Sequence, residues 1–345
     1  MTPGASPLRR YVLTAIVVTA LALTWYGWGS DRDGGYVSDF DQVWRASRLT
    51  IAGADVYTEP LRISSPDSLP AMGFYYPLTS AVIAIPVAPF SLRLARFVWV
   101  GAGVFTFTLL LLRRYSYERL PAVMSGAFLM AVSLAQWAPW IACAVIAPAS
   151  FAWVLSGKPN VGVAAATATR FTARAVVLAL LPPVLAFAWR PGWFAEWQHV
   201  LSTADHFRPY VLRPGGALLL LSLFRWRRPE ARWLSVIACV PGTPSIAEAL
   251  VLFAFPMTFR QCLYLALLTH IPNFLMIGGH FDSFKAFTDR AGVLILLFVY
   301  IPVLVAVLLR PNQGAVPLAI ERFVRRWPQW IRGERDGSSL PAHTA

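Results

Sequence analysis

The stretch YVLTAIVVTALALTWYGW, residues 11–28, decides the class of this protein. It carries no charged side chain, it follows two arginines, and it ends in aromatic residues that suit a membrane–water interface. Because it lacks the small-residue cleavage site of a secretory signal peptide, we expect it to remain as a first helix. The arginines before it predict an N-terminus in the cytoplasm.

The rest of the chain continues this pattern. Of its residues 57% are hydrophobic and only 14% are charged, whereas a soluble domain has roughly 25% charged residues. No Asp or Glu occurs between residues 77 and 117 or between residues 119 and 195. Further apolar runs lie at approximately 77–91, 97–112, 120–135, 138–156, 175–189, 214–224, 233–257, 260–277 and 291–309. The run 77–91 could be re-entrant or broken, and the run 233–257 could be one piece or two. The apolar runs predict an all-α, polytopic membrane bundle of about nine or ten transmembrane helices, although several runs are shorter than the ~20 residues of a perpendicular span.

The net charge of +13 has a matching explanation in membrane topology. The bases stand in short clusters between apolar runs, as in cytoplasmic loops, whereas a nucleic-acid-binding protein groups them on one soluble face. We therefore expect a multi-pass protein of the plasma (inner) membrane with both termini on the cytoplasmic side, and no nucleic-acid partner. Residues 1–310 would form the membrane domain, and residues 311–345 a basic, partly disordered tail. The three cysteines are far apart and predict neither a disulfide framework nor a metal site.

One polar segment stands out, between residues 29 and 76. It holds seven of the seventeen acidic residues, and with the N-terminus inside it falls on the extracytoplasmic side. Asp39 and Asp41 are its sharpest feature. Either could begin a helix as a cap, or one could serve as a general base at the membrane interface. Two carboxylates alone are too few for a metal site.

A second polar segment, residues 190–214, mixes tryptophans with histidine, aspartate and arginine. This composition suits a membrane interface. His206 and Arg208 belong to it and are expected on the same side as Asp39.

The first polar segment also resembles a known family. The runs SDFDQVWRASRLTIAGADVYTEP (residues 38–60) and GFYYPLTSAVIAIPVAPF (residues 73–90) are similar to the first extracytoplasmic loop of glycosyltransferase family 87. That family includes polyprenyl-phosphate-mannose-dependent mannosyltransferases of actinobacteria. The residues that carry the resemblance are Asp39, Trp44, Ala46, Gly53, Asp55, Tyr57, Tyr76 and Pro77. Gln136 resembles the family's Gly-Gln motif, with Ala135 in place of Gly, and Lys158-Pro159 resembles its later Lys/Pro motif.

The resemblance implies a GT-C fold and a membrane glycosyltransferase. Such an enzyme would move a sugar, mannose or arabinose-like, from a polyprenyl-phosphate donor to a lipid or glycan acceptor on the extracytoplasmic side, with inversion and with no cofactor or metal ion. The family's catalytic aspartate carries over to Asp39, with Asp41 as the second candidate. Candidates to bind the donor phosphate or the acceptor are Arg45, Arg48, Tyr57, Tyr76, Gln136, Lys158, His206 and Arg208.

Two other classes fit the same composition. A transporter or flippase places ionisable groups within its membrane segments and often shows inverted repeats. Here Glu248 is the main acid inside an apolar run, and no repeat is visible. A relative that has lost activity and serves as a scaffold is the third reading. For Lys158, a charge in a cytoplasmic loop remains the alternative to a role in the site.

Overall fold

The computed structural model describes residues 7–32, 38–58, 74–204, 207–277 and 279–314. Within these ranges the chain is helical, with turns and irregular connections and no β-strand. The all-α class is therefore confirmed. Residues 33–37 and 59–73 of the predicted outer loop lie outside the described residues, as does the tail from residue 315 onward.

The helices vary widely in length, and single-turn and 3₁₀ segments alternate with longer α-helices. The α-helices are α1 Pro7–Arg32, α2 Asp39–Ile51, α3 Leu78–Ala84, α4 Leu92–Tyr115, α5 Gly126–Ser133, α6 Ala138–Ile146, α7 Pro148–Phe151, α8 Pro159–Ala168, α9 Ala173–Trp189, α10 Trp193–Thr203, α11 Pro229–Cys239, α12 Phe259–Leu268, α13 His270–Met276, α14 Phe284–Ile295 and α15 Ile301–Leu308. The 3₁₀ segments are η1 Ile85–Val87, η2 Ser116–Met124, η3 Ala152–Ser156, η4 Tyr210–Leu212, η5 Gly216–Arg225 and η6 Ile246–Ala254, and η7 Leu296–Tyr300 is a π-helical turn.

Three helical stretches in the described part of the chain are long and apolar enough to cross a membrane: Pro7–Trp28, Leu92–Met124 and Phe284–Leu308. The bent pair of α9 and α10 raises the number to four if it counts as one span. By length and composition, the described residues thus contain fewer candidate spans than the nine or ten transmembrane helices that the sequence predicts. The first predicted helix, by contrast, is confirmed as α1.

Prolines stand at several of the breaks between helices, because a proline inside a helix removes a hydrogen bond and clashes with the preceding turn, although α9 stays continuous through Pro182 and Pro183. The apolar run 138–156 is divided into α6, α7 and η3, with Pro148 at the first break. The run 233–257 is divided into α11 and η6, with Pro241 and Pro244 between them. Such short apolar helices bury their surface against the protein itself, so an apolar run does not by itself indicate a crossing.

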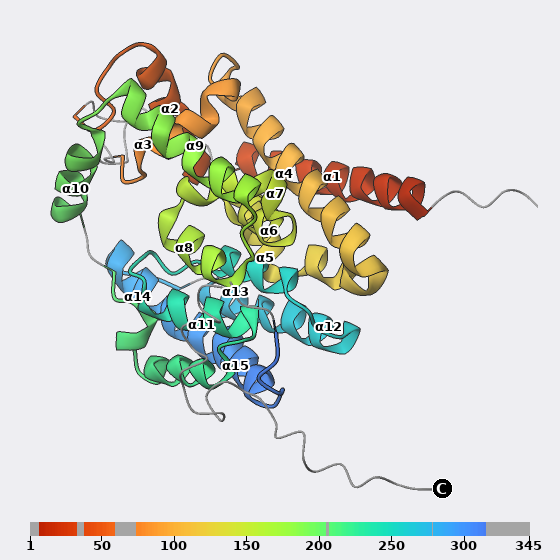
Figure 1. Cartoon of the computed structure of the whole chain (residues 1–345). Helices are drawn as coiled ribbons and strands as arrows, with labels where there is room; N and C mark the ends of the chain where they lie inside the picture. Colours follow the sequence, from red (N-terminus) through yellow and green to blue (C-terminus); the bar gives the residue numbers. More distant parts are fainter. Residues whose placement is uncertain (1–6, 33–37, 59–73, 205–206, 278, 315–345) are drawn as a thin grey trace, which may run out of the picture.

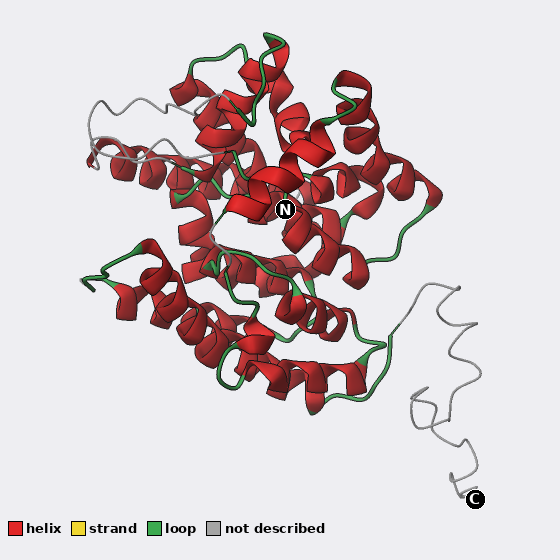
Figure 2. Cartoon of the chain, turned by 90° about the vertical axis from the view of Figure 1, so that its left-hand side faces the viewer, coloured by secondary structure: helices red, strands yellow, loops and turns green. Residues whose placement is uncertain are grey.

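Apolar side chains lie both in the interior of this protein and on its exposed surface. Figure 1 shows the long helices α1 and α4 side by side, and they pack closely. The other faces of α1 expose large apolar side chains, among them Leu13, Ile16, Val17 and Leu21. In contrast, all nine residues of η6 are buried, and η6 packs on α5 and α6. Figure 2 shows the same all-helical body from the side. Large exposed apolar patches are rare in soluble monomers, so this surface suits lipid.

Two helix ends have the same left-handed turn, and both position residues discussed below. After α2, Gly53 has a φ of +71°; its N–H donates to the Thr50 carbonyl, and the Ala54 N–H donates to the Leu49 carbonyl. After α5, Ala135 has a φ of +46° and makes the matching bond to Val132. This pair of bonds is the Schellman motif, in which glycine is the usual left-handed residue. Ala135 therefore adopts a conformation that costs a side-chain-bearing residue about 1–2 kcal/mol.

The strain at Ala135 leads to a prediction. Ala135→Gly should leave the stability of the protein unchanged or raise it by up to about 1 kcal/mol, because glycine removes the left-handed penalty while adding some backbone entropy to the unfolded chain. Ala135→Val should destabilise by about 1–3 kcal/mol, because a β-branched residue is strained at positive φ. Thermal unfolding of the purified protein in detergent measures both changes. A less stable glycine variant would contradict the prediction.

Candidate functional site

The first candidate carboxylate, Asp41, has a structural role. It lies in the first turn of α2, is buried, and accepts hydrogen bonds from both the backbone N–H and the hydroxyl of Ser38 at 2.8 and 2.7 Å. Arg96 of α4 donates to the same carboxylate from Nε, at 2.6 Å, and from Nη2. Both oxygens of Asp41 are thus occupied in holding the start of α2 and attaching it to α4. The helix-cap alternative expected Asp39 or Asp41 to be the cap, whereas the N-cap residue is Ser38 and Asp41 completes a capping box from the third helical position.

Asp39, two residues earlier, has a different environment. Its backbone N–H donates to the carbonyl of Leu134 at the end of α5, at 3.2 Å. The Tyr76 hydroxyl donates to Oδ2 at 3.0 Å, and the side-chain amide of Gln136 donates to the same oxygen. No described residue donates a hydrogen bond to Oδ1 of Asp39, and the residue is only half-buried. One oxygen is therefore held in place, and the other remains able to accept a proton.

Gln136 is held in one orientation by Lys158. The ammonium group of Lys158 lies 3.2 Å from Oε1 of Gln136. Because an ammonium group only donates hydrogen bonds, the amide oxygen must face Lys158 and the amide nitrogen must face Asp39. Lys158 in turn forms an ion pair with Glu248 of η6, at 3.1 Å. The result is a continuous polar chain from Tyr76 through Asp39, Gln136 and Lys158 to Glu248.

Local packing brings Lys158 to this position. Gly157 lies directly against the indole of Trp137, and a Cβ at residue 157 would be 2.5 Å from two atoms of that ring. The Thr79 hydroxyl of α3 donates to the carbonyl of Ser156 at 2.6 Å. The segment before α8 is thus attached to α3 on one side and to the residue after Gln136 on the other. With 12% of its side chain exposed, Lys158 is an interior residue and not a charge in a surface loop.

The Gly-x-Asp-x-Tyr segment, residues 53–57, holds the backbone of Tyr76 in position. Gly53 turns the chain after α2, and Asp55 accepts from the backbone N–H of Tyr57 at 2.9 Å. The Tyr57 hydroxyl then donates to the backbone carbonyl of Tyr76 at 3.4 Å. Asp55 also forms an ion pair with Arg190, at 2.8 Å. The predicted binding residue Tyr57 thus acts on Tyr76 and does not lie beside Asp39.

The surroundings of Asp55 and Tyr76 determine the charge state of each side chain. Burial raises the pKa of Asp55, but the Tyr57 N–H, the Thr58 side chain and Arg190 outweigh it, so the pKa lies below its usual value. Burial and the negative charge of Asp39 raise the pKa of the Tyr76 phenol well above its usual value. Tyr76 therefore keeps its proton and remains a hydrogen-bond donor to Asp39.

The remaining predicted residues lie apart from this chain of contacts. The Arg48 guanidinium stacks over Trp44 at 5.0 Å, and Arg48 is exposed. Arg45 is half-buried, and its Nε has no hydrogen-bond partner among the described residues. Arg208 is exposed. His206 lies outside the described residues.

Glu248 was not among the predicted site residues, although the sequence contains a signal for it. It is the one acid in the apolar run 233–257, and an ionisable residue inside a membrane segment is by default a candidate for function. Its partner could not be read from the sequence, because Lys158 lies in a different segment with no fixed spacing to Glu248.

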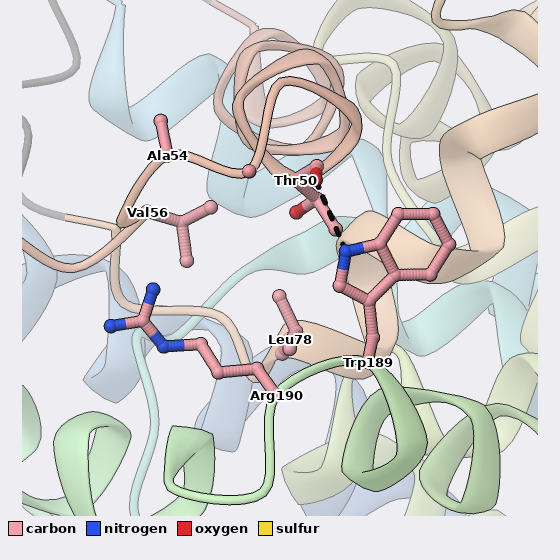
Figure 3. A pocket seen from close by; sticks show the side chains of 7 residues that line it. Thr50, Ala54, Val56, Leu78, Trp189 and Arg190 are labelled. Atoms are coloured by element: carbon pink, nitrogen blue, oxygen red, sulfur yellow. Dashed lines mark hydrogen bonds between the residues drawn. The ribbon is translucent and has the colours of Figure 1, made fainter.

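A small cavity lies at the other end of α2 (Figure 3). It has a volume of about 150 Å³ and is lined by Thr50, Gly53, Ala54, Val56, Leu78, Trp189 and Arg190. The indole N–H of Trp189 donates to the carbonyl of Thr50 at 3.2 Å, as the dashed line in Figure 3 shows. Thr50 lies eleven residues after Asp39, about 16 Å along a helix axis. The cavity therefore does not contain Asp39, although Gly53 and Arg190 in its lining belong to the contacts that support Tyr76.

In the described part of the chain, no group of three or more His, Cys, Asp or Glu side chains is placed to hold a metal ion. Comparison of the chain with protein-family models, with curated proteins and with solved structures gives no match.

The Lys158–Glu248 pair gives a prediction that is independent of any activity. Lys158→Met should destabilise the protein by about 3–5 kcal/mol, because it leaves the Glu248 carboxylate buried without a counter-ion. The double variant Lys158→Met with Glu248→Gln should be markedly more stable than Lys158→Met alone. Thermal unfolding in detergent measures both. Lys285→Met is the matched control, because Lys285 is the other lysine of the chain and is exposed. Additive effects of the two substitutions would contradict the pairing.

Proposed function

We propose that the protein is a membrane glycosyltransferase that takes a sugar from a polyprenyl-phosphate donor and passes it to a lipid or glycan acceptor. The observation that carries the proposal is the asymmetric environment of Asp39. Oδ2 is held by Tyr76 and Gln136, whereas Oδ1 receives no hydrogen bond from a described residue. A general base needs this combination of a fixed orientation and a free oxygen.

The resemblance to glycosyltransferase family 87 supports the same assignment. The residues that suggested it, Asp39, Tyr76, Gln136 and Lys158, are far apart in sequence and belong to one polar network in the folded chain. Gly53 and Ala135 both occupy left-handed positions, which is the physical reason for a glycine in each motif. The GT-C fold and the extracytoplasmic position of the network belong to the proposal.

The chemistry requires few groups. Oδ1 of Asp39 accepts the proton of an acceptor hydroxyl as its oxygen attacks the anomeric carbon of the donor sugar. The bond between that carbon and the phosphate oxygen breaks, and the phosphate leaves with the bonding electrons. Attack from the face opposite the phosphate inverts the anomeric centre. The departing charge needs cationic or hydrogen-bonding partners.

Substitution of Asp39 tests this role. Asp39→Asn keeps the size of the side chain but removes the base, so sugar transfer from a polyprenyl-phosphate sugar in detergent should fall by about 10²–10⁴-fold. Asp282→Asn serves as the matched control, because Asp282 is exposed, and it should transfer sugar at the wild-type rate. Thermal unfolding would verify that both variants fold. Full activity of Asp39→Asn would exclude Asp39 as the base.

One observation favours a transporter as the second candidate. The Lys158–Glu248 ion pair is buried among apolar helices, and intramembrane ion pairs are common on transport pathways. Reconstituted vesicles distinguish the two functions. Accumulation of a substrate across the membrane without any sugar transfer would favour transport and would contradict the glycosyltransferase.

A further inference from the structure

A second group of polar side chains is buried away from Asp39. Arg213 follows η4, and its side chain is only 3% exposed. Its guanidinium lies 5.9 Å from the ring of Tyr210, whose ring centroid is 5.0 Å from that of Tyr300. Trp233 of α11 packs edge-on against Tyr300, with ring centroids 5.7 Å apart. We call these four residues the Arg213 cluster.

The Arg213 cluster has more hydrogen-bond donors than acceptors. Nη1 of Arg213 donates to the backbone and side chain of Asp289 at 3.1 Å. Nε and Nη2 of Arg213 and the indole nitrogen of Trp233 have no hydrogen-bond partner among the described residues, whereas the hydroxyls of Tyr210 and Tyr300 interact with each other. Guanidinium and indole groups can only donate. Because buried donors are costly without partners, their partner is expected to be a group rich in acceptor oxygens.

The backbone around the cluster is adapted to hold it. Gly292 of α14 lies flat against the guanidinium, and a Cβ there would be 2.6 Å from Cζ of Arg213. Tyr300 ends the π-helical turn η7, and such turns occur frequently at functional sites. Both features lie in the apolar stretch Phe284–Leu308. A glycine contact and a helix irregularity thus place two of the cluster's side chains.

The cluster also lies near the Asp39 network. Trp233 lies on α11, and α11 packs on α8, which begins directly after Lys158. Burial and the carboxylate of Glu248 raise the pKa of the Tyr210 phenol, whereas Arg213 and the hydrogen bond with Tyr300 lower it. The neighbouring segment η5 packs on η4 and exposes the large apolar side chains Leu218, Leu221, Leu223 and Phe224. A charged head-group site beside an apolar surface suits a ligand with a phosphate and a hydrocarbon chain, since each buried CH₂ contributes about 0.8 kcal/mol.

We propose that the Arg213 cluster binds the phosphate group of a lipid-linked substrate, with the prenyl chain along η5. Phosphate oxygens accept several hydrogen bonds at once, and arginine binds them with paired N–H groups. This inference rests on the proposed function for the identity of the lipid, but it concerns residues that neither the motifs nor the Asp39 network includes. Arg213, Tyr210, Tyr300 and Trp233 are binding residues in this proposal, and Asp39 remains the base.

Binding of a polyprenyl monophosphate without a sugar tests the inference. Its effect on the thermal unfolding of the full-length protein in detergent gives an apparent affinity, with polyprenol and inorganic phosphate as separate probes. Arg213→Gln should weaken polyprenyl-phosphate binding by about tenfold or more, because charge-assisted hydrogen bonds are lost. Tyr300→Phe removes only a hydroxyl and should weaken it by about threefold. Arg290→Gln is the control, since Arg290 is an exposed arginine on α14, and it should bind as the wild type does.

If the Arg213→Gln variant and the Tyr300→Phe variant both fold and both bind polyprenyl phosphate with wild-type affinity, the proposed phosphate site is wrong. Internal water would then be the partner of the buried donors of the Arg213 cluster. Equal stabilisation by inorganic phosphate or by polyprenol would overturn the lipid-phosphate assignment. Asp39→Asn should bind polyprenyl phosphate normally. Binding that depends on Arg213 in a wild-type protein without transferase activity would refute the proposed function and leave this inference standing.

Discussion

The side-chain amide of Gln136 is the contact on which the candidate site depends. It is the only group in the described structure that joins the half-buried carboxylate of Asp39 to the interior ion pair of Lys158 and Glu248. Since a lysine can only donate, the ion pair fixes which end of the amide faces Asp39. The orientation of the Asp39 carboxylate is thus set by a charge pair that does not contact it. Because the network is buried, it stabilises the fold when all its members are present. Loss of any one member destabilises the fold, since it leaves a buried polar or charged group without a partner.

The turns at the ends of α5 and α2 position the candidate site as much as its side-chain contacts do. The left-handed residue Ala135 stops α5 and directs Gln136 inward, and the carbonyl of Leu134 just before it receives the N–H of Asp39. One turn therefore positions both partners of the Asp39–Gln136 contact. Gly53 has the equivalent role after α2, where it leads to the Asp55 and Tyr57 contacts that support Tyr76. Backbone geometry, more than residue type, brings these short motifs together.

The sequence predicted the class of the protein well and its number of spans poorly. Apolar content and the run at residues 11–28 predicted a helical membrane protein, but apolar runs do not show whether a short helix faces lipid or packs inside the protein, as η6 does. Asp39, Tyr76, Gln136 and Lys158 were named from short motifs, and the structure places them in contact. Asp41 could be separated from Asp39 only by its partners Ser38 and Arg96. Glu248 and the Arg213 cluster depend on contacts between distant segments, which spacing along one chain does not reveal.

The ion pair of Lys158 and Glu248 has a consequence for biosynthesis. Glu248 lies ninety residues after Lys158 in the chain. At synthesis rates of 5–20 residues per second, Glu248 is therefore synthesised roughly 5–20 seconds after Lys158. During that interval the ribosome-bound chain contains Asp39, Gln136 and Lys158 but lacks the residue that neutralises the interior charge. The ion pair can therefore form only after η6 has been synthesised. A chain truncated before residue 248 would leave Lys158 without its counter-ion.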